Sequence, residues 1–268
     1  MVDPAEQLTT HHSPEDQLIK FEQPLTERMR TFLRIEFLVQ QAAFHIQDRT
    51  YHGTRAAVSS FLEILTILGR GDARAEVMKE LERQSEILSR YRRTRGVDTV
   101  QLDSLIQNLG GMRTRLAEAG ALFMNPLKEC DFLSTIRHRS AIPGGTCVFD
   151  LPDYAYWLNL PYADRVEQLE AWMDRLRPIY DPVSELLWLT RESNEPTYRV
   201  ATGGLYQYNL PRTEHFNMVR VLTPAACGMF PEISAGQHRF TVRFLSWQGV
   251  DQRPTQVTQD VRFLLALC

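Results

Sequence analysis

Cys147 is the residue best placed for covalent chemistry, because it closely follows the glycine pair Gly144-Gly145. A thiol nucleophile needs a base such as histidine and an oxyanion hole, and these partners can be distant in the sequence. A free cysteine also behaves as a small apolar residue that packs inside a protein. We therefore expect Cys147 to be structural and the chain not to be an enzyme. A thiol-dependent enzyme that uses Cys147 is kept as an alternative.

Metal and phosphate sites are not indicated by the sequence. The four cysteines show no paired spacing, the seven histidines are scattered, and neither CxxC nor HExxH occurs. None of the three glycine pairs belongs to a GxxxxGKS, GxxxxGKT or GxGxxG motif. We expect no metal and no cofactor, and reduced cysteines in a cytoplasmic protein.

Two pairs of arginines are suited to binding carboxylates or carbonyl groups. Arg30 and Arg34 share one face of a predicted helix, and Arg239 and Arg243 share one face of a predicted strand. The planar guanidinium fork suits both kinds of acceptor. Glu27 can neutralise Arg30 from one turn earlier, but Arg34 has no acid three or four positions away. Arg34 therefore needs solvent, a tertiary carboxylate or a ligand, and Arg239 and Arg243 lie either on a solvated surface or at a binding site.

The net charge of −3 is unevenly distributed along the chain. Residues 196–268 carry seven arginines against four acids, whereas residues 1–195 carry 23 basic against 29 acidic residues. Nucleic-acid binding favours a strongly basic domain with a pI above about 9, and the pI here is about 6.2. We predict no nucleic-acid partner, but the local basic surplus leaves an arginine-rich nucleic-acid-binding adaptor as an alternative.

The first part of the chain is predicted to be helical. Thr26 is a plausible N-cap, and Asp72 and Asp98 are predicted to cap two later helices. Asn125-Pro126 is predicted to open a further helix. Spacings of three, four and seven predict one buried face for the first helix, made of Met29, Phe32, Leu33, Phe37 and Phe44.

The pattern changes at Pro143, where a proline and two glycines end the helical run. Residues 147–149 and 154–160 are predicted as short strands. Helical spacing returns at residues 166–176, and Asp181-Pro182 is predicted to open another helix. From Tyr198 onward the signals are strand-like, and HRFTVRF (residues 238–244) alternates cleanly between apolar and polar side chains.

These elements predict an α+β fold, with a mainly α-helical domain and a small antiparallel β domain. We expect a disordered N-terminal tail over residues 1–20, which has little to bury and no secretory signal. Residues 21–142 and 161–195 are assigned to the helical domain, and residues 143–160 and 196–268 to the β domain. No apolar run approaches the length of a membrane span, so no membrane partner is expected.

Two segments carry a family resemblance: FEQPLTERMRTFLRIEFL (residues 21–38) and RHRSAIPGGTCVFDLP (residues 137–152). Together they resemble the ZapD family, also called YacF, of bacterial cell division proteins. Further matching segments run in the same order along the chain from residue 21 to residue 268: RGDARAEVMKELERQ (70–84), WLNLP (157–161), GLYQ (204–207), PEIS (231–234) and HRFTVRF.

The resemblance implies a homodimer that binds the C-terminal tail of the tubulin-like protein FtsZ through a basic pocket. It also implies bundling of FtsZ filaments and assembly of the Z-ring at mid-cell, with no catalysis. The basic positions of the family fall on these residues: Arg30, Arg34, Arg70, Arg239 and Arg243. Residues 1–20 extend beyond the usual start of the family. Asp131 and Ala155 stand where some relatives carry a basic residue, so we expect a less basic rim around the pocket.

Overall fold

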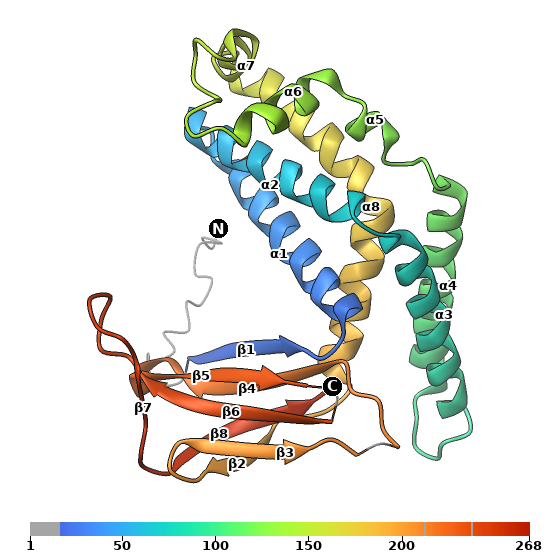
Figure 1. Cartoon of the computed structure of the whole chain (residues 1–268). Helices are drawn as coiled ribbons and strands as arrows, with labels where there is room; N and C mark the ends of the chain where they lie inside the picture. The colour runs from blue at the N-terminus through green and yellow to red at the C-terminus, as the bar shows by residue number, and fades with distance from the viewer. Residues whose placement is uncertain (1–16, 212, 237) are drawn as a thin grey trace, which may run out of the picture. The chain divides into compact units, whose positions relative to one another are not determined.

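The computed structural model describes residues 17–211, 213–236 and 238–268. The chain forms two compact units (Figure 1). Among the described residues, the β unit contains residues 17–29 together with Thr190–Cys268, and the helical unit is Arg30–Leu189. The helical unit is therefore inserted between the first strand and the remaining strands. This α+β architecture confirms the predicted fold class.

The described residues form helices and strands with the following bounds. The helices are α1 (Glu27–Gln47), α2 (Tyr51–Gly69), α3 (Ala73–Tyr91), α4 (Thr99–Ala119), α5 (Asn125–Lys128), α6 (Asp131–Ser140), α7 (Pro152–Leu158) and α8 (Tyr162–Glu192). The strands are β1 (Leu18–Pro24), β2 (Thr197–Ala201), β3 (Leu205–Asn209), β4 (Met218–Pro224), β5 (Met229–Ala235), β6 (Arg239–Ser246), β7 (Thr255–Gln256) and β8 (Val261–Leu267).

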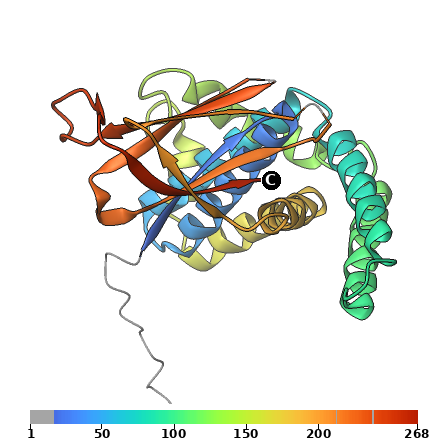
Figure 2. The same cartoon turned by 90° about the horizontal axis from the view of Figure 1, so that it is seen from below.

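Three of the predicted helix caps are confirmed. Thr26 Oγ1 accepts a hydrogen bond from the Met29 amide at 3.1 Å. The carboxylates of Asp72 and Asp98 accept from first-turn amides of α3 and α4 at 2.9 to 3.1 Å. Each bond satisfies an N–H group that has no partner within the helix, which explains why these helices begin where the sequence predicts. Figure 2 shows α3 and α4 side by side as a helical hairpin of the helical unit.

The strand predicted over residues 154–160 is wrong, because most of this segment forms α7. Pro152 occupies the first turn, where its missing N–H costs nothing. Tyr154 and Leu158 lie four residues apart and are both buried, which is the spacing of a helix. The Trp157 ring stacks on Trp172 of α8 at 6.0 Å between centroids, and this aromatic packing favours the helix over the predicted strand.

The strand predicted over residues 147–149 is also wrong, because these residues lie in a series of turns. Gly144 has a φ of +73°, a conformation that residues with a Cβ rarely adopt. A Cβ on Gly145 would collide with the Arg139 carbonyl oxygen. The glycine pair therefore forms a tight turn, and the apolar residues that follow it point to solvent, with Phe149 86% exposed.

Helix α8 runs without a break through Pro178 and Pro182, where a second helix was predicted to begin. Proline removes a helical hydrogen bond and usually kinks or ends a helix. Here the apolar residues on both sides of the prolines, from Leu176 to Leu187, are buried along one face. This burial outweighs the lost hydrogen bonds, and Figure 1 shows α8 as a single ribbon.

The β unit consists of two antiparallel sheets, with strand orders β1-β4-β8-β2 and β3-β6-β5 and with β7 paired to β6. Their inner faces share one apolar core, to which Val221 of β4, Phe240 of β6 and Phe263 of β8 contribute. Strand β1 pairs with β4 from Leu18 to Pro24. The prediction of a tail over residues 1–20 is therefore wrong for Leu18–Lys20, and residues 1–16 lie outside the described residues.

A partly buried ion cluster joins three elements of the β unit. The Glu22 carboxylate on β1 accepts hydrogen bonds from Nε and Nη2 of Arg191, near the end of α8, at distances of 2.8 to 3.3 Å. Arg220 Nε on β4 lies 3.2 Å from the same carboxylate, and Arg220 Nη1 donates to the Arg191 carbonyl at 2.7 Å. Because the Glu22 side chain is only 17% exposed, its charge depends on these two guanidinium groups.

We predict that Glu22→Gln lowers the free energy of unfolding by about 3 kcal/mol, because two guanidinium groups then lose the carboxylate that they share. Glu232→Gln is the matched control, since the Glu232–Arg243 pair is about half exposed and such pairs contribute less than about 1 kcal/mol. Urea unfolding and hydrogen exchange of the β1 and β4 amides measure the two changes. Equal effects of both substitutions would contradict the importance of the buried cluster.

Candidate functional site

Arg30 and Arg34 lie on one side of α1, as the sequence predicts. Arg30 is half-buried, and Arg34 is exposed. The Arg34 guanidinium makes no hydrogen bond or ion pair with any residue that the structure describes. Of the three environments that the sequence leaves open for Arg34, a tertiary carboxylate is therefore not found among the described residues. Solvent or a ligand remains.

The predicted buried face of α1 is wrong for Phe37 and Phe44, which are 65% and 71% exposed. The buried face follows a neighbouring stripe, made of Met29, Phe32, Ile35, Leu38, Val39, Ala42 and Ile46. Phe37 and Phe44 are seven residues apart and do share a face, but this face also carries Arg30 and Arg34. The predicted face therefore combined residues of the buried stripe, such as Met29 and Phe32, with Phe37 and Phe44 of the adjacent exposed stripe.

Arg70 stands at the end of α2 as its C-cap residue, where its N–H donates to the Ile67 carbonyl at 3.2 Å. The residue is exposed, and its side chain makes no hydrogen bond or ion pair within the described part of the chain. Gly71 follows with open space around its Cα. A guanidinium at a helix end with no internal partner is available to an external acceptor.

Arg239 and Arg243 project from the outer face of β6, as predicted. The alternate residues Phe240, Val242 and Phe244 are completely buried in the β core, so the backbone under the arginines is fixed. Arg243 lies 3.6 Å from the Glu232 carboxylate on β5, directly across the strand pair. Arg239 is exposed. The Cα atoms of Arg239 and Arg243 are about 13 Å apart, because four residues of a strand separate them.

The five predicted arginines fall on both units. Arg30, Arg34 and Arg70 belong to the helical unit, and Arg239 and Arg243 belong to the β unit. Within each unit the arginines are held on regular secondary structure or directly at its end.

Asp131 and Ala155 have different structural positions. Asp131 is exposed in the first turn of α6, where its negative charge is favourable near the helix N-terminus. Ala155 is buried in α7. A buried alanine adds nothing to the electrostatics of a surface, so only Asp131 makes its neighbourhood more acidic.

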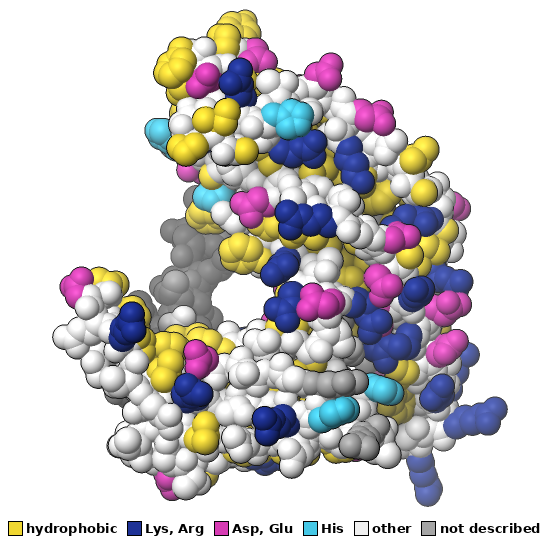
Figure 3. All heavy atoms as spheres, in the orientation of Figure 1, with side chains coloured by type: hydrophobic (Ala, Val, Ile, Leu, Met, Phe, Trp, Pro, Cys, Tyr) yellow, Lys and Arg dark blue, Asp and Glu magenta, His cyan; other side chains and the backbone are white. Residues whose placement is uncertain are grey.

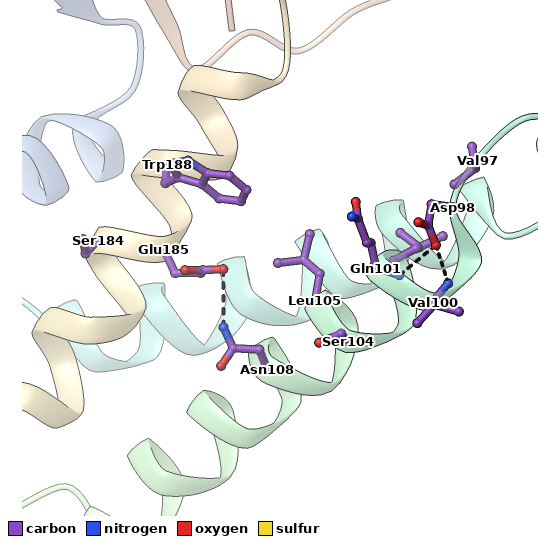
Figure 4. A pocket seen from close by; sticks show the side chains of 11 residues that line it. Val97, Asp98, Val100, Gln101, Ser104, Leu105, Asn108, Ser184, Glu185 and Trp188 are labelled. Atoms are coloured by element: carbon purple, nitrogen blue, oxygen red, sulfur yellow. Dashed lines mark hydrogen bonds between the residues drawn. The ribbon is translucent and has the colours of Figure 1, made fainter.

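A groove of about 1170 Å³ lies between the N-terminal half of α4 and α8 in the helical unit (Figure 4). Leu105 and Trp188 line it from the two helices, and Asn108 donates to Glu185 across it at 3.4 Å. The lining includes two carboxylates and no arginine or lysine. This groove is therefore chemically different from the predicted arginine site.

Cys147 lies in the turns that follow the glycine pair. Its Sγ is half-buried and donates to the Asp150 carboxylate at 3.4 Å, and no hydrogen bond joins it to a histidine among the described residues. Burial raises the pKa of the Cys268 thiol.

No group of three potential metal ligands occurs in residues 17–211, 213–236 and 238–268. Within the same residues, no helix is both long and apolar enough to cross a membrane.

Basic side chains do not form a uniform patch on the face drawn in Figure 3. Over the helical unit, lysine and arginine side chains are interspersed with acidic ones. Within the helical unit, charges also pair at short range, as in Arg92–Asp103 at 2.7 Å and Arg113–Glu82 at 3.2 Å. Such a mixed surface gives little support to binding of a long polyanion.

Comparison with known proteins identifies similar sequences. A family model named ZapD and described as "Cell division protein" matches residues 33–243. A protein of Methylococcus capsulatus named "Cell division protein ZapD" is 34% identical over 250 residues, covering 93% of this chain and 98% of that protein. A protein of Vibrio vulnificus with the same name is 33% identical over 261 residues, covering 97% of this chain and all of that protein.

The structure predicts that Arg34 contributes little to stability, whereas Arg165 contributes much. Arg165 is buried in the same unit and donates to Thr54 Oγ1 at 2.6 Å and to the Leu160 carbonyl at 3.1 Å. We expect Arg34→Ala to change the free energy of unfolding by less than about 0.5 kcal/mol, and Arg165→Ala to lower it by about 3 kcal/mol. Thermal and urea unfolding measure both. A large loss for Arg34→Ala would mean that this residue is structural.

Proposed function

Since the chain belongs to the ZapD family of cell division proteins, we propose that it binds the C-terminal tail of FtsZ and cross-links FtsZ filaments into bundles. In this proposal the protein is a non-enzymatic homodimer that acts in the cytoplasm and promotes Z-ring assembly at mid-cell. The observation that carries the proposal is the presence of exposed guanidinium groups on rigid elements, at the positions that the family resemblance selects.

The chemistry of these arginines supports recognition of an acidic peptide. Arg34, Arg70 and Arg239 make no side-chain hydrogen bond or ion pair with any described residue. A carboxylate or carbonyl oxygen of a bound peptide gains a charge-assisted hydrogen bond there, and no internal interaction has to be broken. The net charge of −3 opposes non-specific binding to polyanions, so the local arrangement of arginines provides the selectivity.

Filament bundling follows from repetition and does not require tight binding of one tail. A twofold dimer presents two equivalent sites, and a filament presents many tails. Once one site is occupied, the second binds at a high effective concentration, so avidity holds neighbouring filaments together. Each contact remains sensitive to salt because it depends on exposed charges, which keeps the bundles reversible.

Co-sedimentation with polymerised FtsZ from the same organism tests the proposal. We expect the protein to pellet with intact filaments at low salt, and to remain in the supernatant with filaments that lack the C-terminal tail. Electron microscopy of the same samples should show bundles only with intact FtsZ.

Pelleting with both kinds of filament would keep the partner but contradict the tail as the binding site. Pelleting with neither, for a protein confirmed as a dimer, would contradict the proposed function.

The Glu232–Arg243 pair generates a second test, because Glu232 competes with a ligand carboxylate for Arg243. We expect Glu232→Gln to strengthen binding of a tail peptide about threefold, since an exposed ion pair contributes up to about 1 kcal/mol. Arg243→Ala should weaken binding, and in that background Glu232→Gln should have almost no effect. Fluorescence anisotropy with a labelled tail peptide measures this cycle. Equal effects of Glu232→Gln with and without Arg243 would exclude the competition.

A further inference from the structure

The exposed side of α1 changes its chemistry along the helix. We define the α1 stripe as Arg30, Arg34, Phe37, Gln41 and Phe44, which follow one another at spacings of three or four and so share one face. The stripe begins with two cations and continues with two phenylalanines that are 65% and 71% exposed. One helix face therefore carries a charged end followed by an apolar end.

The apolar end of the stripe lies in a segment without formal charge. Residues 37–47 read FLVQQAAFHIQ and contain no Asp, Glu, Lys or Arg, although 24% of the whole chain is charged. The exposed positions of this segment are therefore glutamine, alanine and phenylalanine. Exposing phenylalanine side chains to water is unfavourable in free energy. Exposed phenylalanines on an uncharged surface are typical of surfaces that bind a partner.

We infer that Phe37 and Phe44 form the apolar half of the tail-binding surface, and that Arg34 forms part of its ionic half. This inference rests on the proposed function and adds the residues that take the apolar side chains of the tail. The phenylalanines provide affinity that does not depend on salt, whereas the arginines provide the ionic contribution.

The stripe specifies the kind of peptide that fits it. Phe37 and Phe44 are separated by about 10 Å along α1, and Arg34 lies about 5 Å before Phe37. The ligand therefore has two apolar side chains about 10 Å apart on one face, which corresponds to three residues in a polyproline II conformation or seven in a helix. Its acidic residues lie beyond one apolar residue and not between the two. An acidic peptide without this apolar pair should bind only weakly.

Anisotropy titration with a labelled FtsZ tail peptide, at several salt concentrations, tests the inference. We expect Phe37→Ala and Phe44→Ala each to weaken binding by on the order of tenfold, with the slope of log affinity against log salt unchanged. Arg34→Ala should weaken binding and also reduce that slope, because one ionic contact is lost.

Phe149→Ala is the matched control, since Phe149 is an 86% exposed phenylalanine in a turn of the same unit. It should bind the peptide like the unmodified protein. Circular dichroism and thermal unfolding establish that all variants are folded. A photo-crosslinking residue at position 44 should capture the peptide, and the same residue at position 149 should not, which provides a second measurement independent of affinity.

The possible outcomes separate this inference from the proposed function. If the unmodified protein binds the peptide and Arg34→Ala weakens binding, but both phenylalanine variants bind normally, the inference alone is overturned. If Phe37→Ala or Phe44→Ala turns the dimer into a monomer in analytical ultracentrifugation, the stripe is a contact between copies and the inference is also overturned. If the unmodified protein does not bind the peptide at all, both fail.

Discussion

The carboxylate of Glu22 is the constraint on which the β unit depends. The helical unit is an insertion, so the chain leaves the β unit after Met29 and returns at Thr190. Glu22 lies on the strand just before the exit, and its partner Arg191 lies just after the return. Arg220 binds the same carboxylate and the Arg191 carbonyl. One ion cluster therefore holds together the segment that precedes the inserted helical unit and the segment that follows it. The sheet that begins with β1 packs through its inner face against the sheet that carries Arg239 and Arg243.

Local chemistry explains why several elements could be predicted from the sequence. The side-chain oxygens of the caps Thr26, Asp72 and Asp98 accept hydrogen bonds from nearby amides. The cap residue and the amide that it binds therefore lie within four residues of each other in the sequence. The strict alternation in β6 works in the same way, because the side-chain period of a strand is two. This period correctly placed Phe240, Val242 and Phe244 inside and the arginines outside.

Tertiary packing explains the predictions that failed. The sequence predicts a strand where α7 forms, but Trp157 stacks on a tryptophan that is distant in the sequence. The prolines of α8 are local signals to end a helix, and burial against distant residues outweighs them. For the candidate site, periodicity correctly grouped Phe37 with Phe44 but could not tell which of two adjacent stripes faces the core. Arg239 and Arg243 had a predictable orientation, whereas the position of Glu232 opposite Arg243 depends on strand register.

The α1 stripe shows why charge alone is a poor basis for selective binding in this chain. Arginines are numerous, and many form short-range ion pairs with neighbouring acids, such as Arg92 with Asp103. An acidic peptide that used only guanidinium groups would find several similar places on such a surface. The α1 stripe adds to Arg34, which has no side-chain partner among the described residues, two exposed phenylalanines at a fixed spacing. A ligand that must match both the cation and the apolar pair is therefore selected by geometry as well as by charge, and its affinity persists when salt weakens the ionic half.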